Sequence, residues 1–205
     1  PIGGDKVARE PWRSALAICW ELGKSAPFEK DIADIPLLRH AWQRRLNCPQ
    51  TTAVGRLFDA AAALLGLART VSFEGQAPMR LEAVSTFAST VVELPLEKNT
   101  EGIWETDWAP LVDYLLTEPL AIGERAAGWH LSLAHALLAQ AQLLRREYAI
   151  GQVGLSGGVF QNRRLTETVL DLLETAGFTV FLPQQVPVND AGICFGQVVE
   201  IYSMT

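Results

Sequence analysis

The sequence predicts a helix-rich α/β fold that ends in a βαβ unit. Most of the 205 residues fall into amphipathic or alanine- and leucine-rich segments, which favour helix. Segments with strand character are few and short. In the last third, a strand-like run, a helical stripe and a second strand-like run follow one another within about 30 residues, which is the length of a βαβ unit. The two strands of such a unit are parallel, with a right-handed crossover.

The first half is expected to be mainly helical. We expect Asp34 to cap the second helix, with Pro36 in its first turn, while Pro78 is tolerated near the start of the fourth. Gly75 ends a short strand just before that fourth helix. The expected elements are helices at 11–22 and within 31–46, a helix after the Pro-bearing turn in 47–68, a strand at 69–76 and a helix at 77–89.

The second half contains the βαβ unit. Apolar residues form a helical stripe in the segment 163–177, with Asn162 placed to cap its start and Gly177 to end it. The final helix begins just after Asn189-Asp190. The expected elements are strands at 90–96 and 101–108, helices at 109–117 and 124–148, a strand at 152–156, the helix at 163–177, a strand at 178–183 and a final helix at 191–204.

Composition limits the possible functions. With 49% hydrophobic and 20% charged residues, the chain is an ordinary globular protein rather than a disordered one. Its net charge is −6 and its basic residues cluster no further than adjacent arginine pairs, so we expect no nucleic-acid partner. Its apolar runs are shorter than the roughly 20 residues of a membrane span, and no signal peptide is present, so we expect no membrane association.

The three cysteines are widely separated and odd in number, which indicates a reduced, cytoplasmic protein. No Cys-x-x-Cys motif occurs, which argues against a structural zinc site. The chain begins at Pro1 rather than at a methionine, which suggests a trimmed chain or an internal piece of a longer protein.

The stretch Ser156-Gly157-Gly158, followed by Gln161-Asn162, lies where a predicted strand gives way to a predicted helix. Two interpretations are open. The residues form a tight turn and a helix cap, or a phosphate or nucleotide approaches bare backbone at the positive end of the helix. The spacing fits neither the P-loop nor the G-x-G-x-x-G fingerprint.

Three acids also have two interpretations each. Asp59 lies early in an apolar helix, where it either complements the helix dipole or accepts hydrogen bonds from vicinal hydroxyls, as on a ribose. Glu74, beside Gly75, is either an ordinary loop acid or a ligand contact. Asp190 is either an N-cap or a metal ligand. The spacing of five between His130 and His135 does not place both on one helix face, so we expect surface or packing roles for them rather than metal ligation.

Taken together, these segments resemble the C-terminal part of HypF, the carbamoyltransferase of [NiFe]-hydrogenase maturation. The resemblance covers nearly the whole chain and depends on five blocks in the family's order. These are "GGDKVAREPWRSALA", "GRLFDAAAALLGL", "FEGQAPMRLE", "GLSGGVFQNRRL" and "VPVNDAGICFGQ". More distantly similar are the threonylcarbamoyl-transferring TsaD proteins and small-molecule O-carbamoyltransferases.

The resemblance implies an actin/hexokinase-like, RNase H-like nucleotide-binding lobe over 51–205, preceded by a helical lead-in segment over 1–50. Upstream domains of the same polypeptide would make carbamoyl-adenylate from ATP. The transfer domain would then pass the carbamoyl group to the C-terminal cysteine of HypE. The alternatives are an O-carbamoyltransferase lobe and a non-catalytic nucleotide-binding or docking lobe.

Carried over by position, the family's nucleotide contacts fall on Gly55, Asp59, Glu74, Gly157, Gly158 and Asn162. Asp190 would be one ligand of a divalent metal, zinc or iron. The family's H-x-x-x-H metal motif lies upstream of the first block and is absent from this sequence. We therefore assign no catalytic residue within the chain and expect it to be inactive by itself.

Overall fold

The computed structural model describes residues 1–87 and 90–203, and the chain forms two compact units. The first unit comprises Pro1–Pro95 and Thr106–Trp129, and the second comprises Leu96–Glu105 and His130–Thr205. The boundary between them falls inside the long helix α6, Ile122–Tyr148. The domain boundary that we expected at residue 50 lies within the first unit and stays a prediction.

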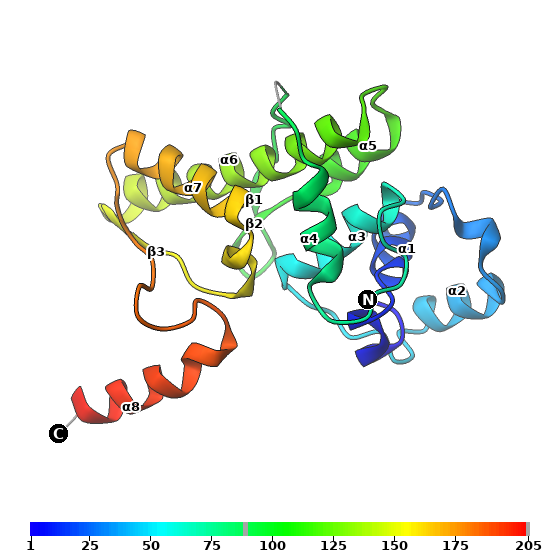
Figure 1. Ribbon diagram of the computed structural model, residues 1–205, viewed down its shortest axis with the longest axis horizontal. Helices are drawn as coiled ribbons and strands as arrows, with labels where there is room; N and C mark the ends of the chain where they lie inside the picture. Colours follow the sequence, from blue (N-terminus) through cyan, green and yellow to red (C-terminus); the bar gives the residue numbers. More distant parts are fainter. Residues whose placement is uncertain (88–89, 204–205) are drawn as a thin grey trace. The chain divides into compact units, whose positions relative to one another are not determined.

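The first unit is helical (Figure 1). Its central helix is α3, which packs against α1, α4 and α5. The side chains from Ala60 to Ala63 are fully buried, because a run of short side chains lets neighbouring helices approach α3 from several sides. The elements of this unit before α6 are a 3₁₀ turn at Gly4–Ala8, α1 (Trp12–Glu21), a 3₁₀ turn at Glu29–Asp31, α2 (Ile35–Gln43), α3 (Val54–Leu64), α4 (Gln76–Val84) and α5 (Ala109–Thr117).

Helix α5 lies directly against the first turns of α6. A Cβ added at Gly128 would meet the Tyr114 hydroxyl at 2.2 Å, so only glycine permits this approach. Beside it, the rings of Phe58 and Trp129 make an edge-to-face contact with centroids 6.2 Å apart. These contacts close the core of the first unit around α3.

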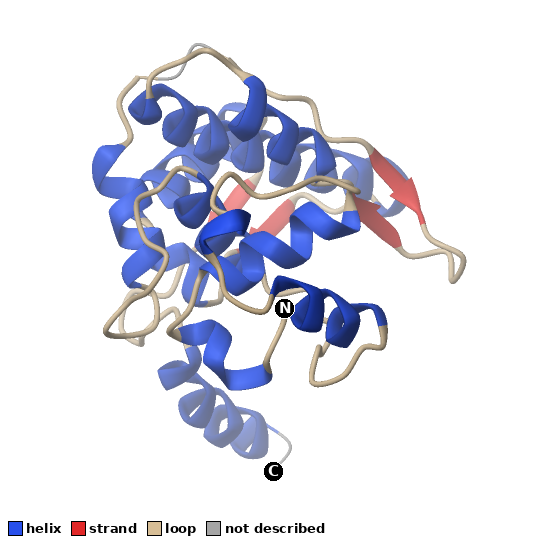
Figure 2. Ribbon diagram, turned by 90° about the vertical axis from the view of Figure 1, so that its right-hand side faces the viewer, coloured by secondary structure: helices blue, strands red, loops and turns tan. Residues whose placement is uncertain are grey.

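The second unit contains the predicted βαβ unit. Strands β3 (Gln152–Gly154) and β4 (Thr179–Phe181) pair in parallel, with Val153 opposite Val180, and α7 (Arg163–Thr175) connects them. The parallel βαβ prediction is confirmed. Figure 2 shows the two short strand pairs among the helices. The other elements of the unit are the hairpin strands β1 (Leu96–Lys98) and β2 (Trp104–Thr106, with its last residue in the first unit), the rest of α6, 3₁₀ turns at Gly158–Gln161 and Asp190–Gly192, and α8 (Ile193–Ser203).

Most predicted helices are confirmed, but the strand predicted at 69–76 is wrong. That segment is a series of bends in which the Ser72 amide donates to the Gln76 side chain at 2.8 Å. Its backbone also bonds outside the segment: the Val71 amide donates to the Arg9 carbonyl at 2.9 Å, and the Arg69 carbonyl accepts from the Trp12 amide at 3.3 Å. The strand predicted at 90–96 was also wrong over most of its length: β1 begins only at Leu96, after Pro95, which has no amide hydrogen for a ladder.

Two helix predictions need a smaller correction. Asp34 does precede α2, but with φ 60° and no hydrogen bond from its side chain to the helix. Helix α4 ends at Val84 instead of continuing towards residue 89. Residues 88 and 89 of that predicted helix, and residue 204 of the final one, lie outside the described residues.

Candidate functional site

The glycine pair after β3 adopts two different conformations. Gly157 has φ 114° and ψ 155°, a region that is essentially restricted to glycine. Its amide donates to the carbonyl of Val188 at 2.7 Å. Gly158 is exposed and does not have a positive φ, and a Cβ added to it would have its nearest neighbours at 3.9 Å. The first glycine is therefore required by the backbone, whereas the second leaves open space above it.

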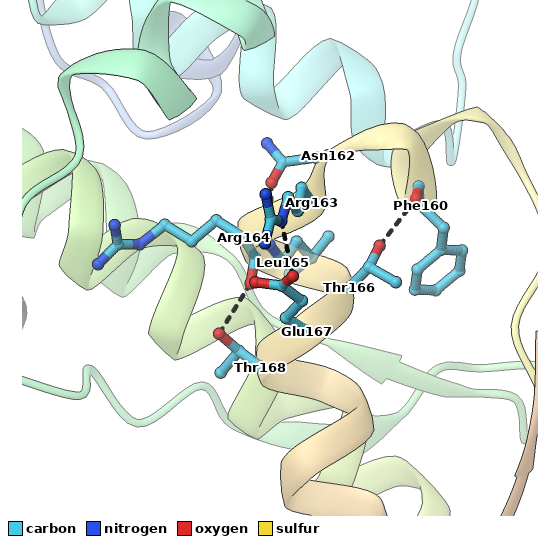
Figure 3. Close-up of polar contacts among 8 residues, drawn as sticks. All are labelled: Phe160, Asn162, Arg163, Arg164, Leu165, Thr166, Glu167 and Thr168. Carbon is cyan, nitrogen blue, oxygen red and sulfur yellow. Dashed lines mark hydrogen bonds and ion pairs between the residues drawn. The ribbon is translucent and has the colours of Figure 1, made fainter.

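Asn162 joins this loop to α7. Its Oδ1 accepts a hydrogen bond from the Leu165 amide at 2.9 Å, which confirms the predicted cap. In the same turn, the hydroxyl of Thr166 donates to the carbonyl of Phe160 at 2.8 Å (Figure 3). The loop is thereby bonded to the first turn of the helix from two positions.

The start of α7 has a positive electrostatic character. Its first turn contains two arginines and no acid. Arg163 is exposed and pairs with Glu167 at 2.6 Å, while Arg164 extends away from the helix on the side opposite Thr166 (Figure 3). Together with the helix dipole, this arrangement favours an anion beside the glycine loop.

The segment 187–192 lies beside the glycine loop, because the Gly157 amide donates to the Val188 carbonyl. The cap here is Asn189, whose side chain accepts from the Ala191 amide at 3.1 Å. The prediction that Asp190 caps this helix is therefore wrong, and the Asp190 carboxylate is exposed. A Cβ at Gly192 would meet the Pro187 carbonyl at 2.6 Å, so this turn also requires a glycine.

In the first unit, Arg56 brings Asp59 and Glu74 together. Its guanidinium lies 2.9 Å from Asp59 Oδ2 and 2.8 Å from Glu74 Oε1. Asp59 is buried, and no residue within 1–87 and 90–203 forms a hydrogen bond to its Oδ2; the contact with Arg56 is an ion pair without hydrogen-bond geometry. Burial raises the pKa of Asp59 to about 6, although Arg56 acts in the opposite direction.

Gly55 and Gly75 lie beside this cluster, and the structure gives a different reason for each glycine. Gly55 lies in the first turn of α3, and a Cβ there would meet no atom within 4 Å. Gly75 precedes α4 with φ 87°, so the turn after Glu74 requires a left-handed residue. Asp59 and Glu74 thus meet at Arg56, next to Gly55, and Glu74 lies in a turn instead of at the end of the predicted strand.

The described residues do not form a metal centre. Among residues 1–87 and 90–203, no three His, Cys, Asp or Glu side chains gather in a group able to hold a metal ion. Asp190 offers a single carboxylate, whereas a divalent ion takes three or more protein ligands to compete with water. The residues present therefore do not by themselves fit a zinc or iron site.

Two residues near the predicted site had escaped the sequence interpretation. Arg56 was detectable, because its spacing of three from Asp59 on a helix allows an ion pair. His130 was not: it is buried and its Nε2 lies 2.9 Å from Asn162 Nδ2, a contact between residues 32 positions apart.

Comparison with known proteins identifies the family. Residues 1–197 match the family described as "Carbamoyltransferase, Kae1-like Domain, second subdomain". The chain belongs to the HypF carbamoyltransferase family. HypF from Synechocystis sp. is 38% identical over 96% of the chain and 28% of its own length. HypF from Rhodobacter capsulatus is 36% identical over 96% of the chain and 26% of its own length.

Solved HypF structures share the fold. A full-length HypF in a phosphate- and nucleotide-bound form has a TM-score of 0.88 at 28% identity, covering 99% of this chain and 28% of that one. HypF from T. kodakarensis has a TM-score of 0.81 at 24% identity, which supports the fold alone. The expected HypF resemblance and its fold class are confirmed, and the chain spans about a quarter of its relatives' length. Of the helices that the structure describes, none is long and apolar enough to cross a membrane.

Proposed function

We propose that this chain is the C-terminal lobe of a HypF-type carbamoyltransferase and holds the nucleotide part of carbamoyl-adenylate. The full protein would transfer the carbamoyl group to the C-terminal cysteine of HypE. The supporting observation is the Gly157-Gly158 loop, bonded to Val188 and placed before an acid-free helix start. It occurs in a chain whose fold matches a HypF structure with bound phosphate and nucleotide.

The glycine loop would border the phosphate side of the nucleotide. Gly157 sets the backbone conformation, and the open space above Gly158 lets a ligand reach the main chain. The dipole of α7 and its first-turn arginines supply positive potential. The side-chain amide of Asn162 already accepts from the Leu165 backbone amide and lies against His130. We therefore propose that Asn162 supports this loop without contacting the nucleotide.

Within the first unit by itself, we propose the cluster around Arg56 as a candidate contact for vicinal hydroxyls, as on a ribose. Asp59 and Glu74 are acceptors for vicinal hydroxyls, and Gly55 leaves the first turn of α3 open to a ligand. Asp59 Oδ2 pairs with Arg56 but accepts no hydrogen bond from the described residues, and a buried acceptor in this state is costly unless a ligand donates to it.

In the proposed reaction, the HypE thiolate sulfur attacks the carbamoyl carbon. A carbon–sulfur bond forms, the bond from that carbon to the adenylate phosphate oxygen breaks, and AMP leaves with the electron pair. Positive potential at the loop stabilises the charge that develops on this phosphate. No step is assigned to a metal, because Asp190 alone does not fit one.

ATP binding to the 205-residue chain tests the nucleotide site. Calorimetry should show weak binding to the unmodified chain and none to Gly158→Val, whose side chain fills the space above the loop. Gly151→Val is the matched control, because Gly151 is also exposed, has no positive φ and has open space around its Cβ position. Circular dichroism checks that both variants fold. Equal ATP affinity in all three proteins would refute the proposal.

Transfer itself is tested with the full-length protein. Given ATP, carbamoyl phosphate and HypE, it should add one carbamoyl group to the HypE cysteine, as seen by intact-mass spectrometry. A HypE variant without that cysteine is the control. Carbamoylation of a hydroxyl acceptor instead of the thiol would replace the proposed acceptor with that of an O-carbamoyltransferase.

A further inference from the structure

We infer that His130, on α6, is a positioning residue for the glycine loop and acts through Asn162. The inference rests on the proposed nucleotide site only for its functional consequence. Its structural part concerns three groups in the second unit: the Leu165 amide, the Asn162 side chain and the His130 imidazole. Both side chains are buried, with exposed fractions of 1% for His130 and 8% for Asn162.

The directions of both hydrogen bonds follow from the Leu165 amide, which has a fixed role as a donor. The Leu165 backbone amide can only donate, so the Asn162 atom at 2.9 Å from it must be Oδ1. The other end of the amide is then Nδ2, a donor, and it faces His130 Nε2 at 2.9 Å. His130 Nε2 must accept this bond. The imidazole is therefore uncharged, with its proton on Nδ1.

This bond fixes the orientation of the Asn162 amide. A flipped amide would point its NH₂ group at the Leu165 amide and its oxygen at the imidazole, which would remove the cap. A protonated ring would place two donors against each other. Because water has little access to either side chain, it is poorly placed to replace the lost bond.

The Asn162 cap is one of several attachments of the loop. Gly157 bonds to Val188, Phe160 accepts from Thr166, and the Asn162 side chain caps α7. Of the three named here, the Asn162 cap is held by the His130 side chain, which lies outside the loop, the segment at Val188 and α7. Removing the imidazole acceptor should therefore loosen the end of the loop next to α7, while the bond at Gly157 remains.

The role of Asn162 is accordingly indirect. Both ends of its amide have partners within the protein, and the side chain is almost inaccessible. We assign the nucleotide contacts to the loop backbone and assign Asn162 and His130 to holding that backbone in place.

The wild-type chain gives the first test. Nitrogen NMR of the imidazole at neutral pH should show His130 Nδ1 protonated and Nε2 bare. The side-chain NH₂ of Asn162 should exchange slowly with solvent. A proton on Nε2, or a charged ring, would overturn the inference regardless of whether the chain binds nucleotide.

Substitution gives the second test. His130→Leu keeps an apolar side chain but removes the acceptor. We expect Asn162 side-chain exchange to speed up at least about tenfold and ATP affinity to fall by about tenfold, equivalent to about 1.4 kcal/mol. His130→Gln can present Oε1 near the position of Nε2 and should restore most of both. His135→Gln, on the same helix, should change neither.

These readouts separate this inference from the proposed function. If the wild-type chain binds no ATP, the nucleotide site fails, but the tautomer and the Asn162 exchange still decide the positioning role. If His130→Leu does not fold, the tautomer in the wild-type chain decides alone. Unchanged Asn162 exchange in a folded His130→Leu variant would overturn the role of His130.

Discussion

Replacing the buried Asp59 with asparagine should stabilise the protein at neutral pH and have little effect in acid. Burial raises the pKa of this carboxyl to about 6 in the folded chain, with Arg56 partly compensating and Glu74 adding to the rise. In the unfolded chain the ordinary value is about 3.9. The folded state therefore holds this proton more tightly, so the contribution of Asp59 to stability falls as pH rises.

The size of the effect follows from the two pKa values. A shift of roughly two units corresponds to about 3 kcal/mol, since one unit is about 1.4 kcal/mol. This penalty is absent below about pH 4, develops between pH 4 and pH 6, and is complete above pH 6. An asparagine side chain at this position would resemble the protonated carboxyl, so Asp59→Asn should gain about 2 to 3 kcal/mol above pH 7 and almost nothing at pH 4.

Urea denaturation of both proteins from pH 4 to pH 8 measures this difference. Arg56→Gln is the informative partner variant, because removing the cation that faces Asp59 should deepen the loss of stability above pH 6. Glu74→Gln should have the opposite effect and lessen the loss of stability above pH 6, because the Glu74 carboxylate adds to the rise in the pKa of Asp59. A stability difference between Asp59→Asn and wild type that is constant across this pH range would refute the raised pKa.

Three further outcomes are expected. Gly157→Ala should lower the unfolding free energy by about 1–3 kcal/mol, because it forces a side chain into a glycine-only conformation, whereas Gly158→Ala should change it by no more than about 0.5 kcal/mol in the same urea titration. Asn189→Ala should cost about 1 kcal/mol through the lost cap, and Asp190→Asn should cost less than about 0.5 kcal/mol; a reversal of this order by thermal denaturation would contradict the assigned cap. The 205-residue chain, given ATP, carbamoyl phosphate and HypE, should yield no carbamoylated cysteine by intact-mass spectrometry, and an adduct above the no-enzyme control would contradict this expectation.

The helices and the βαβ unit were predictable because their evidence is local. The stripe of α7, its cap at Asn162 and the glycine that ends it, with φ 77° at Gly177, all lie within one short segment. The match at α5, Ala109–Thr117, has the same origin. A periodic pattern and its end signals are sufficient to predict an element whose backbone hydrogen bonds lie within the element itself.

Strands and site contacts were less predictable because their partners lie elsewhere in the chain. The segment before Gly75 alternates like a strand, yet its backbone bonds to the Gln76 side chain and to the backbone of Arg9 and Trp12. The cap of the last helix was placed one residue late, since Asn189 and Asp190 are equally good caps by type and only the backbone geometry distinguishes them. The contact between His130 and Asn162 leaves no sequence pattern at all.

Two features of this chain oppose folding, one at Asp59 and one at Gly157. Asp59 keeps a buried carboxylate that is charged at neutral pH, and Gly157 holds a conformation closed to other residues. Stability alone would favour an apolar residue at the first position and an ordinary turn at the second. Such costs concentrate where a structure is shaped for a ligand. Asp59 and Gly157 both lie in segments that the family resemblance assigns to the nucleotide, so these costs add to the case for ligand binding.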